Sequence, residues 1–185
     1  MNGTDVELIE MCLGGNDEAF SEIITRYKKL VFNVIYNLSV NKSDVSDISQ
    51  EVFLKVYRSL KSYNPQYKFA TWLIKITTNV SIDWLRQKKN NHLSVDDITE
   101  TSDDESNPED QFIDKEELKQ LRKAISELPE MYRVPVVLFH QQHMSYREIE
   151  KVINEPQTIV KNRLYRGRHM LKEKLQSYKE EVQAI

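Results

Sequence analysis

The side chains best suited to recognising a ligand are concentrated near the C-terminal end, in residues 157–177. Between Lys161 and Lys174 this stretch carries six Lys or Arg side chains, one Glu, and Tyr165. In the major groove of DNA, Arg and Lys pair with guanine and Asn pairs with adenine. A basic helix can equally be a solvated surface, so the stretch alone leaves both interpretations open.

The residues that precede this stretch favour the DNA interpretation. Ser145 and Glu148 have the Ser-x-x-Glu spacing of a capping box, which predicts a helix start. A short helix to Ile153, a turn containing Pro156 and a longer helix from about Gln157 form a helix-turn-helix pattern. In the longer helix the apolar positions leave four side chains pointing outward: Lys161, Asn162, Tyr165 and Arg166.

A second line of polar side chains recurs at helical spacing: Lys75, Asn79, Asp83 and Arg86. Between Ile74 and Ile82, however, apolar and polar residues also alternate, which is the pattern of a strand. The chain has only four glycines, and no other segment offers a convincing partner strand. Because an isolated strand has no hydrogen-bond partner, we predict a helix over residues 71–87.

Aromatic and cationic side chains are interleaved just before that helix: Tyr63, Tyr67, Lys68 and Phe69. Rings stack on unpaired bases and cations follow the phosphate backbone, so this combination suits single-stranded nucleic acid. Trp72 and Trp84, at helical spacing, are predicted to lie in the core rather than to stack on nucleotides.

A third candidate surface is the polar edge of residues 44–60, which contains Asp47, Gln50 and Glu51. Such an edge can dock another protein or can simply be the solvated side of an amphipathic helix. The pattern by itself favours the solvated side.

Signatures of catalysis and of cofactor binding are missing. The sequence has no glycine-rich phosphate loop, and its four histidines lack metal-ligand companions at useful spacing. The single cysteine, Cys12, excludes an internal disulfide and is predicted to be a packing residue. No apolar run approaches the roughly 20 residues that span a bilayer, and the acidic start does not resemble a signal peptide. We therefore expect a cytoplasmic protein with no cofactor, no metal and no membrane insertion.

The charge of the chain is unevenly distributed. The net charge is −3, but residues 91–114 hold nine Asp or Glu and no Lys or Arg. The rest of the chain has 26 basic and 20 acidic side chains, a formal charge of about +6. We predict an all-α protein with two small helical domains, residues 1–90 and 115–185, joined by a flexible acidic linker at 91–114.

Six stretches in order along nearly the whole chain resemble the extracytoplasmic-function sigma factors, the smallest class of bacterial σ70-type factors. They are GNDEAF at 15–20, DISQEVFLK at 47–55, KFATWL at 68–73 followed by Asn79, Asp83 and Arg86, LPEMYR at 128–133, SYREI at 145–149, and VKNRLYRGR at 160–168. The resemblance implies two domains, σ2 and σ4, that bind core RNA polymerase through its β′ and β subunits and direct it to promoters.

The resemblance also implies roles for individual residues. Asp47, Gln50 and Glu51 match the surface that docks on the β′ clamp helices, which reverses the interpretation of that edge as merely solvated. The σ2 positions match the segment that opens the minus-ten element of double-stranded promoter DNA and captures its melted strand: Asn64, Lys68, Phe69, Lys75, Asn79, Asp83 and Arg86. The σ4 positions match the reader of the minus-thirty-five element: Lys161, Asn162, Tyr165 and Arg166 on bases, with Arg163 and Arg168 on phosphate or in a structural role.

Some positions depart from the pattern of the family. Many relatives have Gly-Thr where this chain has Thr158 and Ile159, an apolar residue in place of Glu155, and a small residue in place of Glu150. The family also implies an anti-sigma factor as a partner and a linker that runs toward the active-site channel of the polymerase. Two alternatives are a sigma-like decoy that only binds an anti-sigma factor and a helix-turn-helix repressor with an unrelated N-terminal domain.

Overall fold

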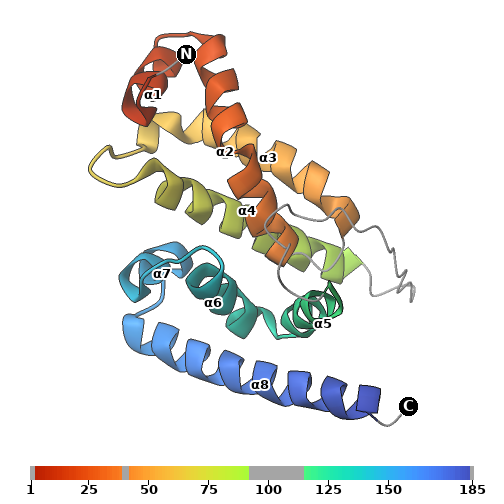
Figure 1. Cartoon of the computed structure of the whole chain (residues 1–185). Coiled ribbons are helices and arrows are strands. Elements are labelled where there is room, and N and C mark those ends of the chain that lie inside the picture. The colour runs from red at the N-terminus through yellow and green to blue at the C-terminus, as the bar shows by residue number, and fades with distance from the viewer. Residues whose placement is uncertain (1–2, 39–41, 92–114, 184–185) are drawn as a thin grey trace.

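The computed structural model describes residues 3–38, 42–91 and 115–183. These residues form eight α-helices and two short 3-10 helices, with no strand among them, which confirms the all-α prediction (Figure 1). The elements are α1 (Asp5–Leu13), α2 (Asp17–Leu38), η1 (Lys42–Asp44), α3 (Val45–Ser59), η2 (Leu60–Ser62), α4 (Phe69–Asn91), α5 (Lys115–Ser126), α6 (Glu130–His140), α7 (Tyr146–Ile153) and α8 (Gln157–Gln183). The predicted linker lies almost wholly outside the described residues.

Helices α1 to α4 pack as one bundle around the apolar stripe of α2. Val31 and Ile35 of α2 are fully buried against Ile48 and Val52 of α3 and Leu73 of α4. Full burial of each such side chain is worth about 1.5–3 kcal/mol. The predicted core residues Trp72 and Trp84 pack against this cluster.

The strand-like alternation in residues 74–82 belongs to helix α4, so the helix prediction was correct, although the helix is longer at both ends than predicted. The buried hydroxyl side chains of Thr77 and Ser81 are accommodated because they bond to the helix itself. Thr77 donates to the carbonyl of Leu73 at 2.9 Å, and Ser81 donates to the carbonyl of Thr77 at 2.8 Å. Such bonds let small polar side chains be buried inside a helix bundle.

Helices α5 to α8 form the second bundle. The predicted capping box is present, because Ser145 Oγ accepts from the backbone N–H of Glu148 and Glu148 Oε2 accepts from that of Ser145 at 2.8 Å. Helix α7 ends at Ile153 and is capped by Asn154, whose φ of 55° is left-handed and permits the tight turn before α8. Gly167 lets α8 approach α6, since a Cβ there would lie 2.8 Å from a methyl group of Val136.

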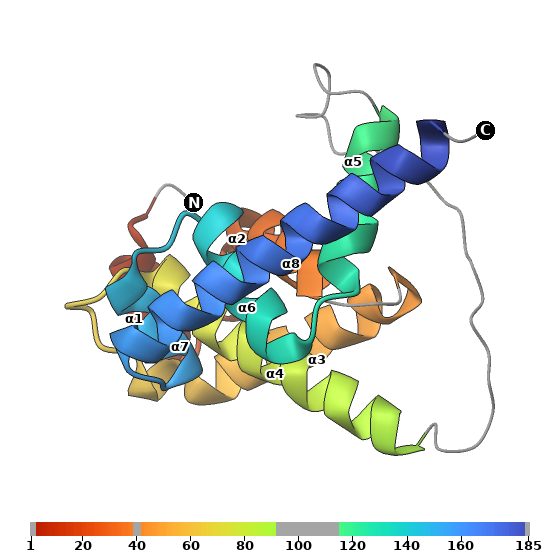
Figure 2. The ribbon, with the colours of Figure 1, turned by 90° about the horizontal axis from the view of Figure 1, so that it is seen from below.

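The two bundles share a core. Val34 and Leu38 of α2 and Ile74 of α4 belong to the same buried cluster as Leu128 and Val137 of the second bundle. Helix α7 packs against α4, whereas α8 lies on the outside, in front of α6 and α7 when the molecule is seen from below (Figure 2). The structure is therefore a closed arrangement of both halves.

Candidate nucleic-acid and polymerase interfaces

The outer face of α8 carries the four predicted base-reading residues. Lys161, Asn162, Tyr165 and Arg166 are all exposed, Tyr165 to 67% of its surface. Val160, Leu164 and Gly167 lie buried on the opposite face, so packing fixes the rotation of the helix. A helix that follows a capped short helix and presents amide, cationic and aromatic groups outward has the composition of a major-groove reader.

Arg163 and Arg168 are engaged within the protein. Arg163 donates to Glu155 Oε1 at 2.8 Å, and its side chain is mostly covered. Arg168 donates from Nε to Nε2 of His140 at 3.0 Å and lies over the ring of Phe139. Burial and the neighbouring Arg168 lower the pKa of His140, which keeps the imidazole nitrogen available as an acceptor.

Two positions that depart from the family pattern form contacts of their own. Glu155 holds the turn to α8 through Arg163, and Glu150 on α7 accepts from Nε2 of Gln157 at 3.0 Å. Both carboxylates thus tie the turn and the first helix to the start of α8. The structure gives these substitutions a local structural reason.

The loop before α4 is held by its own hydrogen bonds. The Tyr63 hydroxyl donates to the carbonyl of Tyr67, and Asn64 Oδ1 accepts from the backbone N–H of Gln66 at 2.9 Å. Asn64 and Lys68 are exposed, and Tyr67 is 52% exposed. The loop therefore offers a cation and an aromatic ring to a ligand from a fixed backbone.

Phe69 differs from the other residues assigned to DNA. Its ring is only 2% exposed and lies 5.2–5.5 Å, between ring centroids, from Tyr27, Tyr63 and Trp72. Burial gives it a packing role at the start of α4, so we remove it from the set of residues that stack on DNA from the surface. Sequence spacing could not separate it from Tyr67, because both are aromatic residues of the same short stretch.

The polar line of α4 is exposed, as predicted. Lys75, Asn79, Asp83 and Arg86 all face solvent on α4. Arg86 is also paired with Glu130 of α6 at 2.8 Å, so it bridges the two bundles. Lys88, which continues the line in sequence, turns away and binds both carboxylate oxygens of Asp44.

Helix α3 presents the predicted docking edge. Asp47, Gln50 and Glu51 are exposed, while Ile48 and Val52 are buried on the other side. The structure adds Leu54, which is 51% exposed one turn after Gln50. Leu54 could have been identified from the sequence, because it follows Gln50 by four residues and Glu51 by three, which places it on the same edge of a helix.

Helix α7 covers part of the loop before α4. The Lys151 ammonium lies 4.3 Å from the centroid of the Tyr67 ring, and Thr71 Oγ1 donates to Glu148 Oε1 at 3.5 Å. The hydrogen bonds from Ser145 are the main reason why the pKa of Glu148 is lowered, and the charge of Lys68 adds to them. The closed arrangement thus places the first helix of the helix-turn-helix against the candidate single-strand site.

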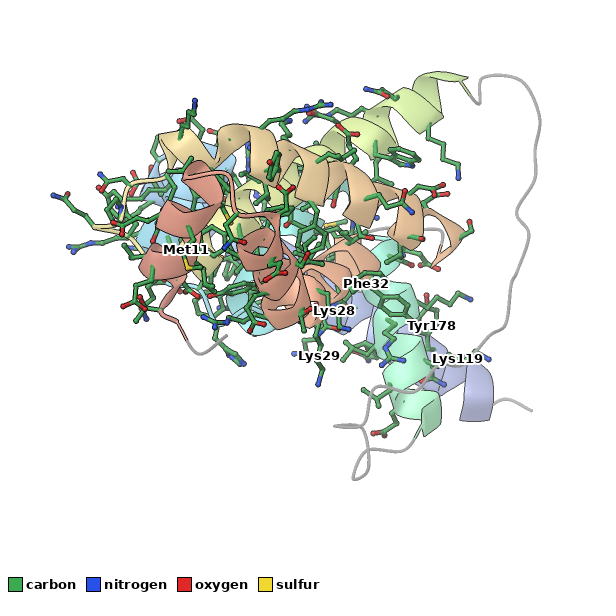
Figure 3. All side chains as sticks on the ribbon, turned by 90° about the horizontal axis from the view of Figure 1, so that it is seen from above. Met11, Lys28, Lys29, Phe32, Lys119 and Tyr178 are labelled. Atoms are coloured by element: carbon green, nitrogen blue, oxygen red, sulfur yellow. The ribbon has the colours of Figure 1, made fainter. Side chains whose placement is uncertain are left out.

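A cavity of about 490 Å³ lies between the bundles on another side of the molecule. Figure 3 shows Lys29 and Phe32 on α2 near α5, which carries Lys119. Phe32 and Leu121 are partly exposed there, and Arg122 lies over the ring of Tyr36. Residues of both bundles line this cavity.

Within residues 3–38, 42–91 and 115–183, no group of three His, Cys, Asp or Glu side chains is placed to hold a metal ion. Over the same ranges, no helix combines the length and the apolar character needed to cross a membrane.

Two family models match the chain. Sigma-70 region 2 matches residues 23–91, and Sigma-70, region 4 matches residues 118–171. The ECF RNA polymerase sigma factor SigW of Bacillus subtilis is 32% identical over 170 residues, which cover 87% of this chain and 91% of SigW. The ECF RNA polymerase sigma-E factor of Escherichia coli is 32% identical over 183 residues, covering 94% of this chain and 95% of that factor.

Solved structures share the fold. CnrH, solved in complex with the cytosolic domain of CnrY, superposes with a TM-score of 0.68 at 22% identity over 94% of this chain and 97% of CnrH. The sigma factor RpoE from Bartonella quintana, in complex with the anti-sigma factor NepR, gives a TM-score of 0.68 at 17% identity over 85% of this chain and 96% of RpoE.

Proposed function

This chain belongs to the extracytoplasmic-function group of the sigma-70 family, and from that premise we propose that it is an alternative sigma factor whose bundles divide the work of promoter recognition. Helices α1 to α4 dock on core RNA polymerase and open the minus-ten element. Helices α5 to α8 read the minus-thirty-five element as duplex DNA. The chain acts in the cytoplasm, beside the polymerase, and the polymerase performs the chemistry.

The observation that carries this proposal is the outer face of α8. Four side chains that suit base recognition are exposed together, while Arg163 and Arg168 brace the helix from its sides. A decoy that no longer reads DNA would have no need for such a face. Asn162 and Arg166 are assigned to base edges, Lys161 and Tyr165 to bases beside them, and Arg168 to phosphate in addition to its internal contacts.

The loop before α4 and the polar line of α4 are assigned to the melted strand. Tyr67 supplies a ring on which an unpaired base can stack, and Asn64 and Lys68 lie beside it for base and backbone contacts. Lys75, Asn79, Asp83 and Arg86 extend the surface along α4. Capture of flipped bases offsets the few kcal/mol that unpairing and unstacking cost.

Polymerase docking is assigned to α3. The acidic and amide edge of Asp47, Gln50 and Glu51 supplies polar contacts to the β′ clamp helices, and Leu54 supplies an apolar contact beside them. Interfaces of this kind combine a buried apolar centre with a polar rim.

We propose an anti-sigma factor as a further partner, because the neighbouring structures of CnrH and of RpoE were solved as complexes with CnrY and the anti-sigma factor NepR. The cavity between α2 and α5 is formed by both bundles. Any protein segment that binds there stabilises the closed arrangement, since binding favours the state in which its site exists.

A DNA-binding assay with and without purified core polymerase tests the proposal. A helix-turn-helix repressor would bind its sites equally well alone. We expect the chain to bind promoter fragments specifically only when core polymerase is added. Glu51→Ala should weaken the binding seen in the presence of polymerase. Specific binding by the chain alone that core polymerase does not change would contradict the proposal.

A further inference from the structure

Ile159 is an aliphatic side chain on the outer side of α8, where the other exposed groups are polar or aromatic. It is 37% exposed, and within residues 157–178 the only other large apolar side chain that is exposed is Tyr165. A single exposed aliphatic residue is ordinary on a protein surface, so exposure alone assigns no role to Ile159. Its place among the residues assigned to bases is what distinguishes it.

Ile159 shares a line along α8 with two of the base-reading residues. Asn162 follows it by three residues and Arg166 by seven, and a helix with 3.6 residues per turn brings both spacings to the same side. All three side chains are exposed, whereas Val160 and Leu164 are buried in the core. The line covers about 10 Å of the helix axis, the length of about three base pairs. Ile159 is therefore placed to meet a base close to those read by Asn162 and Arg166.

The first turn of α8 holds Ile159 in a fixed position. Its backbone N–H donates to the carbonyl of Pro156 at 2.9 Å. Glu155, in the turn before α8, accepts from Arg163, which follows Ile159 by one helical turn, at 2.8 Å. Arg163 compensates the charge of Glu155, so this carboxylate repels nearby phosphates less. A β-branched side chain also has one strongly preferred rotamer in a helix, so the apolar group of Ile159 is presented in a defined direction.

Thymine is the base that suits an aliphatic side chain in the major groove. Its C5-methyl group is apolar, whereas the other groups that base edges present there are hydrogen-bond donors and acceptors. Isoleucine cannot bond to a donor or an acceptor, and covering such a group without a partner costs free energy. Contact with a methyl group instead removes apolar surface of both partners from water.

We propose that Ile159 reads the C5-methyl group of one thymine in the minus-thirty-five element, within about two base pairs of the base read by Asn162. The inference rests on the proposed reading of that element by α8. Asn162 and Arg166 recognise bases through hydrogen bonds, whereas Ile159 recognises a base through apolar contact. It is a specificity-determining residue that favours thymine over cytosine at its own position.

The test uses the full chain assembled with purified core polymerase on a duplex promoter fragment identified by transcript mapping. Each thymine of the minus-thirty-five element is replaced in turn by uracil, which lacks the methyl group but keeps every hydrogen-bonding group. Binding is measured by fluorescence anisotropy in competition with the unmodified fragment. We expect one thymine at which uracil weakens binding about 3- to 5-fold, the effect of burying about one methyl group.

Variants of the chain show whether Ile159 makes this contact. Ile159→Ala should bind the thymine and uracil fragments equally, while Ile159→Val should keep most of the preference because valine is also apolar and β-branched. Asn162→Ala should weaken binding through its own base and leave the difference between thymine and uracil unchanged. Met11→Ala changes a side chain on α1 that is 38% exposed, and this matched control should bind as the wild type does. Thermal unfolding checks that the variants are folded.

The outcomes separate this inference from the proposed function. If the wild type tolerates uracil at every thymine of the element, or if Ile159→Ala keeps the preference, the role of Ile159 is overturned. An equal loss with thymine and uracil in Ile159→Ala also overturns it, since that result gives the side chain a structural role only. If Asn162→Ala, Arg166→Ala and replacement of the whole element all leave binding unchanged, the reading of the minus-thirty-five element by α8 is itself wrong.

Discussion

The ammonium group of Lys151 on α7 lies 4.3 Å from the centroid of the Tyr67 ring, so the first helix of the helix-turn-helix rests on the loop assigned to melted DNA. Arg86 and Glu130 join the same two bundles at 2.8 Å. The minus-ten and minus-thirty-five elements lie about 25 base pairs apart, which is roughly 85 Å along B-DNA. In this structure the helix-turn-helix instead touches the loop and the start of α4 directly, through Lys151 with Tyr67 and Glu148 with Thr71. The bundles must therefore separate before both can bind one promoter.

Weakening the contact between Lys151 and Tyr67 should favour the open arrangement. An exposed cation and ring contribute about 0.5–1 kcal/mol, so Lys151→Gln should increase the open population about two- to fivefold. Spin labels at Lys55 on α3 and Lys172 on α8, in a chain that carries Cys12→Ala, report the distance between the bundles. Lys61→Gln removes an exposed cation elsewhere and should leave the distances unchanged. An unchanged distribution in Lys151→Gln would show that this contact does not hold the bundles together.

Glu148 should make stability depend on pH in the acid range. Its pKa is lowered in the folded state, mainly by the hydrogen bonds from Ser145, so its contribution is fully present above the ordinary carboxyl pKa and is lost as pH falls through the lowered value. Glu148→Gln can keep the capping box but has no charge to titrate. The difference in free energy of unfolding between wild type and variant should therefore shrink between about pH 5 and pH 3. Denaturant unfolding followed by circular dichroism measures it; a constant difference would contradict this role.

Substitutions on α8 should affect DNA binding in two different ways. Truncating Asn162 or Arg166 to alanine should cost about 1–3 kcal/mol at one base position each and leave stability unchanged, because both side chains are exposed. Arg168→Ala should weaken binding at all sequences and also lower stability, since it removes the contacts with His140 and Phe139. Binding to a library of promoter variants, measured with core polymerase present, tests the division. Equal sequence profiles for all three variants would refute it.

Gly167→Ala should destabilise the second bundle although alanine is the better helix former. The added Cβ would lie 2.8 Å from a methyl group of Val136, which is buried and cannot move far. Overpacking of this kind costs about 1–3 kcal/mol. Gly14→Ala is the control, because the nearest atom to its Cβ is 3.4 Å away. Equal midpoints of chemical denaturation in the two variants would show that α8 can shift away from α6.

Sequence reasoning succeeded where a local rule decides the structure. The spacing of Ser145 and Glu148 predicted a capping box that is present, and the lack of a partner strand correctly identified residues 74–82 as helix. It could not predict contacts between distant segments. Nothing near Asp5 in sequence indicates that it meets Arg26 and Tyr27, and Lys88 looks like part of a basic line until its bond to Asp44 is seen. Phe69 was assigned to DNA because the sequence does not show that its ring is buried, in part against the distant ring of Tyr27.

Run-off transcription with purified core RNA polymerase tests the central claim most directly. The templates are genomic promoter fragments identified by mapping transcripts after overexpression of the chain. We predict specific transcripts only when the chain is added, reduced about tenfold by Leu54→Ala or Glu51→Ala on α3, a loss equivalent to about 1.4 kcal/mol of polymerase binding. Lys28→Ala, a change of an exposed residue on α2 away from the docking edge, is the control. Transcripts that do not depend on the chain would contradict the assignment of this protein as the factor that directs polymerase to promoters.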